Sequence, residues 1–262
     1  MATECAPIIN QQQLSFEDML ASPGSVTRNS DSNILYFPTL PYIKKSSKGI
    51  KKEVYAFKDP ADLIRMQKYF HDDCSSRKNL RLRNWLFFTL GINMGFRVSD
   101  LCRLQWKHIF LPDSSKFNLN DWNELTEEKT GKRRQVVINT AAQKAVSHYL
   151  QSLSRRPETL NQDEYVFWSN KKSEPHVQPK SMHRWIKEAA LALNIPFNVG
   201  THSMRKTFGY MLYNATNKNI GLVQHVLNHS SERMTLRYIG IDHENVRAAY
   251  NTVPDVVWIP EN

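Results

Sequence analysis

The pattern of hydrophobic and polar positions divides the chain into a polar N-terminal segment and a longer part with helical periodicity. Residues 1–55 include QQQ, ASPGS and TRNSDSN, which are polar and rich in turn-forming residues, and a lysine cluster in PYIKKSSKGIKK. A segment with so few apolar side chains cannot bury a core of its own, so it is predicted to be poorly ordered. Its lysines could follow a DNA backbone or lie in a solvated linker.

From about residue 56 onward, apolar side chains recur every three to four residues, which predicts amphipathic helices. The first helix is expected to begin near Pro60, because proline suits the first turn of a helix. A longer helical stretch over residues 84–101 is expected to be interrupted at Gly91 and Gly95. Helical periodicity returns over residues 140–153, 180–193, 201–214, 219–228 and 232–238.

Three shorter stretches are typical of extended chain. WNELTEEKTGKRRQVVI, which begins at residue 122, predicts a strand, a turn at Thr130–Gly131 and a second strand rich in valine and isoleucine. LQWKHIFLPDSS, at residues 104–115, predicts a short extended segment, and YVFW, at residues 165–168, predicts a further strand. The expected fold is therefore mainly α with a small antiparallel β-sheet. It forms one domain over residues 56–250, followed by a tail over residues 251–262.

The composition adds the expectation of a polyanionic partner. The 262 residues include 35 Lys and Arg against 25 Asp and Glu, a net charge of +10. The phosphate backbone of a nucleic acid is the usual partner of such a surface, and an anionic membrane surface is the alternative. No apolar run approaches the length of a membrane span, and the N-terminus has no signal-peptide pattern. The chain is therefore expected to be soluble and intracellular.

The three cysteines predict no disulfide framework and no zinc site. Cys5, Cys74 and Cys102 are isolated and odd in number, and none of them has the CxxC spacing of a metal site.

Two arginines, two histidines and a tyrosine follow one another in short motifs. Arg97 lies in MGFRVSDL, His202 and Arg205 lie in THSMRKTFG, and His229 and Tyr238 lie in LNHSSERMTLRYIG. This set does not suit acyl transfer, hydride transfer or metal chemistry. It suits attack by a phenol on a phosphodiester, because each guanidinium fork can donate two parallel hydrogen bonds to phosphate oxygens.

Each motif alone also has a purely structural explanation. Arg97 could pair with Asp100 one turn along a helix. The HxxR motif could combine a core histidine with a surface arginine, and a histidine at a helix C-terminus often interacts with the helix dipole. Three tyrosines in the same region are rivals of Tyr238 as nucleophile: Tyr210, Tyr213 and Tyr250. The order and local context of all the motifs together favour the catalytic interpretation.

In this order, over residues 56–250, the motifs resemble those of the tyrosine recombinase (phage integrase) family. The resemblance implies the catalytic-domain fold of that family and a DNA-cleaving and rejoining enzyme. Tyr238 would attack a phosphodiester and form a 3′-phosphotyrosine, without a metal or ATP. By the same resemblance, the transition state would be stabilised by Arg97, Arg205 and His229, and His202 would assist proton transfer at Tyr238.

A lysine on the predicted hairpin completes this set. Lys129, in EEKTGKRRQ, is identified by resemblance as the general acid that protonates the departing 5′ oxygen, with Lys132 as the alternative. An exposed, charged turn is the structural explanation of both. The LNHSS motif departs from the LGHSS of the family at Asn228. Asparagine is the next most tolerant residue after glycine at a left-handed helix end, so little should change.

The resemblance further implies double-stranded DNA as partner, a homotetramer assembled on two recombination sites, and an accessory directionality factor. It also implies a bacterial or phage-derived enzyme of the cytoplasm. Many family members carry a DNA-clamping helical domain before the catalytic one, and the short polar segment here predicts a short form without it. The tail could pack on a neighbouring protomer or on its own domain. The alternative functions are a catalytically silent DNA-binding regulator on the same fold and an activity like that of a type IB topoisomerase.

Overall fold

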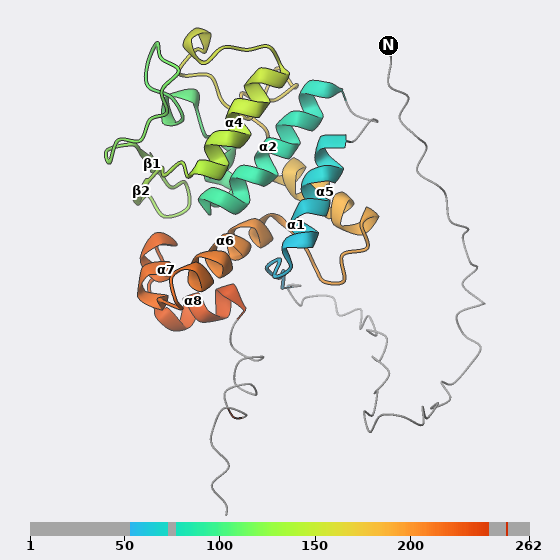
Figure 1. Ribbon diagram of the computed structural model, residues 1–262, viewed down its shortest axis with the longest axis vertical. Helices are drawn as coiled ribbons and strands as arrows, with labels where there is room; N and C mark the ends of the chain where they lie inside the picture. The colour runs from blue at the N-terminus through green and yellow to red at the C-terminus, as the bar shows by residue number, and fades with distance from the viewer. Residues whose placement is uncertain (1–52, 73–76, 241–249, 251–262) are drawn as a thin grey trace, which may run out of the picture. The chain divides into compact units, whose positions relative to one another are not determined.

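The computed structural model describes residues 53–72, 77–240 and 250 (Figure 1). The chain divides into two compact units, Met1–Lys51 and Lys52–Asn262, and every described residue belongs to the second. This unit is mainly helical with one two-stranded antiparallel sheet, as the sequence predicts. None of the helices in the described residues has both the length and the apolar character needed to cross a membrane.

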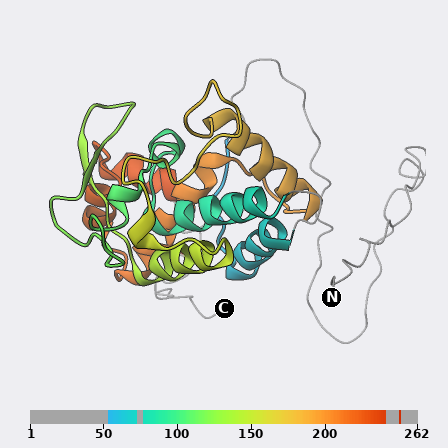
Figure 2. The same cartoon turned by 90° about the horizontal axis from the view of Figure 1, so that it is seen from above.

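Helix α2, Lys78–Met94, lies at the centre of the unit and packs against α1, Pro60–Asp72, α4, Thr140–Ser152, and α6, Thr201–Ala215. Figures 1 and 2 show α1 and α4 beside it. Its apolar side chains point in all directions, and a helix that is apolar all round is stable only when it is buried. The side chains of α2 that are inaccessible to solvent are Leu86, Phe87, Phe88 and Leu90.

The two glycines of this region do different things. The predicted interruption at Gly91 is wrong, because α2 continues through this residue. A Cβ atom at Gly91 would lie 2.5 Å from the Met204 sulfur, so the glycine permits close packing of α6 rather than a break. The interruption at Gly95 is confirmed: this residue ends α2 in the left-handed conformation, with φ of 60°.

The hairpin forms where the sequence predicts it. Strand β1, Glu124–Thr126, pairs with β2, Arg133–Gln135, and the Glu127 amide donates to the Lys132 carbonyl across the turn. Gly131 has φ of 66°, which explains a glycine at this position. The paired strands are shorter than expected, and Val136 and Ile138 continue into the core beyond the end of β2.

Two predictions of extended chain are wrong. Residues 104–115 contain a 3₁₀ helix, Trp106–His108, and the only pairing of residues 165–168 within the described chain is through isolated bridges at Tyr165 and Trp168. Val166 and Phe167 are nevertheless fully buried. Their apolar character serves the core from an irregular segment, a use that hydrophobic periodicity alone does not distinguish from a strand.

The C-terminal helices lie close to their predicted positions. They are α5, Pro179–Ala192, followed by α6, α7, Ile220–Val226, and α8, Glu232–Ile239. Helix α6 packs against α2 and α5 and also against α7 and α8, which cover a small apolar cluster of their own. Shorter elements are α3, Val98–Cys102, and a second 3₁₀ helix, Pro157–Thr159.

The start and the middle of α6 differ from expectation in two details. The N-cap residue is Gly200 rather than Thr201, which is the first helical residue. Gly209 does not leave an open face, because a Cβ there would lie 2.9 Å from Ile239 of α8. This glycine lets α8 approach α6 closely, and α8 carries Tyr238.

Candidate active site

The turn between α2 and α3 places Arg97. Gly95 can adopt its left-handed conformation beside the ring of Phe208, where a Cβ atom would overlap the ring. Arg97 then caps α3, and its Nη1 forms an ion pair with Oε1 of Glu127, at the end of β1. The Arg97 side chain is 16% exposed and the Glu127 side chain is inaccessible. Arg97 therefore pairs across to the hairpin and not with Asp100, one turn along its own helix.

Arg205 joins three elements from the middle of the fold. The residue is only 2% exposed, and burial lowers the pKa of its guanidinium. Its Nη1 donates to the Gly95 carbonyl at 2.7 Å, and its Nη2 donates to the Leu227 carbonyl at 2.5 Å. These carbonyls end α2 and α7, where helices leave such groups without internal partners. Arg205 thus fixes the ends of both helices beside Arg97.

A third arginine, Arg134 of β2, belongs to the same cluster and was not predicted. It is buried, and it donates to the carbonyls of Met94 at 2.9 Å and Gly95 at 2.8 Å. Its guanidinium lies 4.4 Å from the centre of the Phe96 ring, a cation–π arrangement. Burial, together with the charge of Arg205, lowers its pKa to about 9. Arg134 therefore supports the turn that carries Arg97.

His229 follows α7 and is neutral at pH 7. Asn228 adopts the left-handed conformation, with φ of 54°, as expected of this departure from LGHSS. The Thr235 hydroxyl donates to the Ser231 carbonyl, so its oxygen accepts the hydrogen on His229 Nδ1, 3.1 Å away. We infer that Nε2 carries no proton. Burial, followed by the charges of Arg205 and Arg97, lowers the pKa of His229 to about 4.

Tyr238 faces this cluster from α8. Its ring meets the His229 ring edge-on, with ring centres 4.9 Å apart, and the Lys206 ammonium lies 5.4 Å from its centre. Its hydroxyl oxygen is buried and has no geometrically acceptable hydrogen-bond partner among the described residues. Burial raises the pKa of Tyr238, and the charges of Arg205 and Arg97 offset part of that increase. The phenol oxygen is therefore electrostatically coupled to both arginines.

The three rival tyrosines lie elsewhere. Tyr210 and Tyr213 pack against the apolar cluster under α7 and α8, and Tyr250 is largely exposed. None of the ring contacts and hydrogen bonds found in the described residues joins them to Arg97, Arg205 or His229. Only Tyr238, among these four, meets the cationic cluster.

Known proteins agree with this arrangement. Residues 63–245 match the model of the phage integrase family. The chain belongs to the phage integrase family. A curated relative, the probable integrase/recombinase YoeC of Bacillus subtilis (strain 168), is 37% identical over 66% of this chain and 85% of its own length. The chain spans about half the length of the other curated relatives that it matches, all named tyrosine recombinases.

Solved structures show the same fold. XerH recombinase bound to its palindromic difH substrate has a TM-score of 0.57 at 18% identity, covering 78% of this chain and 54% of XerH. The Tn1549 transposon integrase in complex with a circular intermediate DNA has a TM-score of 0.52 at 18% identity, covering 77% of this chain and 66% of that protein. The predicted family, fold class and enzyme class, that of the tyrosine recombinases, are confirmed.

In this phage integrase family member the hairpin turn carries Lys129 at an exposed position. The turn is attached by buried acids: the Asp100 carboxylate accepts the Glu128 amide hydrogen at 2.9 Å, and Glu127 accepts the Thr130 hydroxyl. Burial raises the pKa of Asp100. The turn is thus held from below while Lys129 stays accessible.

His202 lies in the first turn of α6 and is exposed, whereas Arg205, one turn later, is buried. Loss of solvent around the ring, followed by the charges of Arg205 and Lys129, lowers the pKa of His202. The structure therefore brings Lys129 near His202 and does not connect Lys132 to the cluster by any contact found in the described residues. In the part of the chain that the structure describes, no three His, Cys, Asp or Glu side chains gather as metal ligands would.

Proposed function

We propose that this chain is a site-specific DNA recombinase that cuts and rejoins DNA strands through a 3′-phosphotyrosine at Tyr238. One observation carries the proposal. Arg97, Arg205, His229 and Tyr238, which come from four separate elements, act on one another electrostatically in a single buried cluster. A tyrosine with a raised pKa among guanidinium groups is an arrangement suited to phosphoryl transfer, because a metaphosphate-like or phosphorane-like centre carries negative charge.

In the proposed reaction the Tyr238 oxygen forms a bond to the phosphorus while the bond from phosphorus to the 5′ oxygen breaks. The proton of the phenol leaves with the help of His202, and Lys129 supplies a proton to the departing 5′ oxygen. The 5′ hydroxyl of a second strand then attacks the phosphotyrosine and releases Tyr238. The covalent link conserves the energy of the phosphodiester, so the exchange requires no ATP, and guanidinium groups supply the positive charge that a metal would otherwise provide.

Both arginines of the motif retain donors for a phosphate. Each Nη of a guanidinium carries two hydrogens and Nε carries one, so the two backbone carbonyls occupy two of the five donors of Arg205. Arg97 shares its guanidinium with Glu127 alone among the ion pairs of the described residues. His229 accepts a proton less readily than usual here, and the charge of a bound phosphate would favour the imidazolium that can donate to it.

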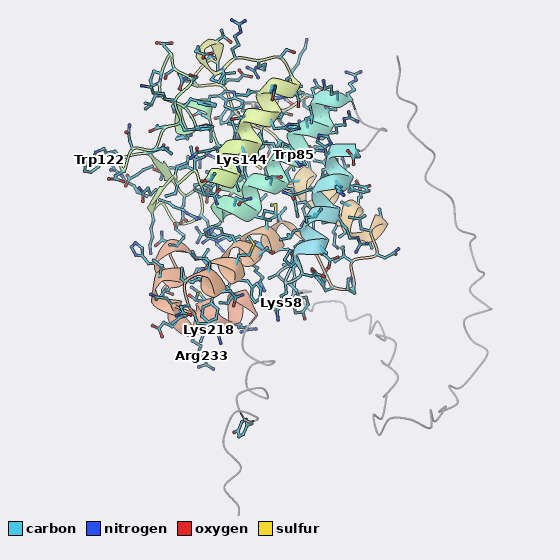
Figure 3. The ribbon with its side chains drawn as sticks, in the orientation of Figure 1. Lys58, Trp85, Trp122, Lys144, Lys218 and Arg233 are labelled. Carbon is cyan, nitrogen blue, oxygen red and sulfur yellow. The ribbon has the colours of Figure 1, made fainter. Side chains whose placement is uncertain are left out.

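The proposed partner is double-stranded DNA, acted on by four copies of the chain at two recombination sites, with an accessory factor setting direction. We place the catalytic domain at residues 56–250, and the reaction in the bacterial or phage-infected cytoplasm. Figure 3 shows Lys58, Lys218 and Arg233 toward the end where α6, α7 and α8 lie, and all three are exposed. Such cations support contact with a phosphate backbone beside Tyr238.

The test is a covalent trap. The full chain is mixed with a library of duplexes, each nicked so that the cleaved strand loses a short 5′-hydroxyl fragment and cannot be rejoined. The adduct should form with the natural chain and be lost in Tyr238→Phe, which keeps the ring. Tyr210→Phe is the matched control and should retain the adduct. Adduct formation by the Tyr238→Phe variant would move the nucleophile elsewhere.

A further inference from the structure

Residues 53–57 lie along the start of α6 and are fixed there by specific contacts. The Tyr55 amide donates to the Asn198 carbonyl at 3.0 Å, and the Asn198 side-chain amide donates to the Glu53 carbonyl at 2.7 Å. The Phe57 amide donates to the Thr207 hydroxyl at 2.8 Å, and this bond is buried. The segment is therefore an integral part of the α6 environment.

One side chain of α6 connects this segment to the candidate nucleophile. Lys206 follows Arg205 in the helix, yet it is only 7% exposed. Its ammonium lies 3.1 Å from Oε1 of Glu53 and 5.4 Å from the centre of the Tyr238 ring. A lysine is seldom buried without a charged partner, so Glu53 makes this position of the ammonium sustainable.

The ring of Tyr238 is placed by contacts on the ring itself. Its hydroxyl has no geometrically acceptable hydrogen-bond partner among the described residues, so no such bond there fixes its direction. The edge-on contact with His229 and the Lys206 ammonium meet the ring instead. A cation over an aromatic face is more favourable when water is excluded, as it is at this buried position.

We propose that Lys206, anchored by Glu53, is a positioning residue that holds Tyr238 toward the arginine cluster. This rests on the proposed function of Tyr238. Because residues 1–52 continue directly into Glu53, the ion pair also offers a route by which events in the N-terminal segment reach the nucleophile. Lys206 acts through Tyr238, since its ammonium is shared between Glu53 and the ring.

Substitutions that separate charge from volume test the role of Lys206 in cleavage. At saturating nicked DNA, Lys206→Met should lower the single-turnover rate of adduct formation about tenfold, the size of one desolvated cation–π contact, with DNA affinity unchanged. Lys206→Arg should restore most of the rate, and Glu53→Gln should have a smaller effect of the same kind. Lys58→Met is the matched control, because the Lys58 ammonium lies 5.7 Å from the Tyr210 ring in a similar arrangement.

A spectroscopic measurement keeps the two proposals apart. The full chain is labelled with 3-fluorotyrosine, and the ¹⁹F resonance of position 238 is assigned by its loss in Tyr238→Phe. Lys206→Met and Glu53→Gln should shift or broaden that resonance, while Lys206→Arg and Lys58→Met should leave it near its original place. An unchanged resonance in Lys206→Met, or equal rates for Lys206→Met and Lys206→Arg, would overturn the positioning role. A shifted resonance in a chain that forms no adduct would uphold the contact and refute the proposed activity instead.

Discussion

The two halves of the candidate site are held in place very differently. In the arginine half, Arg205 and Arg134 donate four hydrogen bonds to backbone carbonyls, and Arg97 pairs with buried Glu127. In the tyrosine half, α8 has eight residues and packs with α7 over a cluster of three fully buried side chains, Val223, Leu227 and Ile239.

The difference separates what must be rigid from what must move. Donors that stabilise charge in a transition state are effective only when they are already oriented, and backbone hydrogen bonds provide that orientation for the guanidinium groups. A nucleophile must approach phosphorus and later leave it, and local stability is lowest where few buried contacts support an element. We therefore expect substitutions in the arginine half to lower both stability and activity, and substitutions at Tyr238 to lower activity alone.

The largest effect is expected at Arg205. Arg205→Ala should reduce the rate of adduct formation by about 10³-fold or more, with a much smaller loss of DNA affinity, because its donors matter most when charge develops on the phosphate. Arg205→Lys keeps the charge without the fork and should restore little. Rates and affinities are measured with the same nicked duplexes. Equal losses of rate and affinity would reduce Arg205 to a phosphate anchor and weaken the distinction between the halves.

The next effect concerns stability at Arg134. Arg134→Met leaves the Met94 and Gly95 carbonyls with fewer donors and should lower the free energy of unfolding by about 2–4 kcal/mol. Tyr238→Phe removes a hydroxyl without a hydrogen-bond partner and should change that free energy by less than about 1 kcal/mol. Urea unfolding of both variants measures the contrast. Similar losses in the two variants would show that the halves are held equally.

The smallest effect is a pH dependence that reports on His229, which lies between the two halves. Its pKa is about 4 in the folded chain, against an ordinary value of 6.5, so the unfolded chain binds more protons between these values. The free energy of unfolding should therefore decrease as the pH falls from about 6.5 toward 4. His229→Gln keeps a hydrogen-bonding group near Thr235 and should reduce the slope. The slope that remains belongs to other histidines with lowered pKa values: His108, His183 and His202. Parallel curves for the two proteins would contradict a cationic environment at His229.

The sequence predicts the fold class and the C-terminal helices well because their apolar spacing is strong and local. It also predicts the turn at Gly95 and the left-handed Asn228, since both depend on the conformational freedom of single residues. The strand expected at residues 165–168 does not form, because an apolar run indicates burial and leaves open whether a partner strand exists.

The supporting residues of the site are less accessible to such analysis. Arg134 alternates with Val136 and Ile138, a period-two pattern that indicates an inward-facing side chain. The carbonyls that it binds, however, belong to a turn about forty residues earlier in the chain. Glu127 and Lys206 depend on similar long-range placement. The residue that acts can be recognised by motif, whereas the residues that hold it depend on tertiary contacts.

The central claim is that Tyr238 becomes joined to DNA. Its most direct test is to isolate the trapped adduct, digest it with protease and nuclease, and identify by mass spectrometry the peptide and the bond that carry the nucleotide. We predict a nucleotide attached through its 3′ phosphate to the peptide that contains Tyr238, together with a released strand ending in a 5′ hydroxyl. A nucleotide on any other residue, or a link through a 5′ phosphate, would contradict the account.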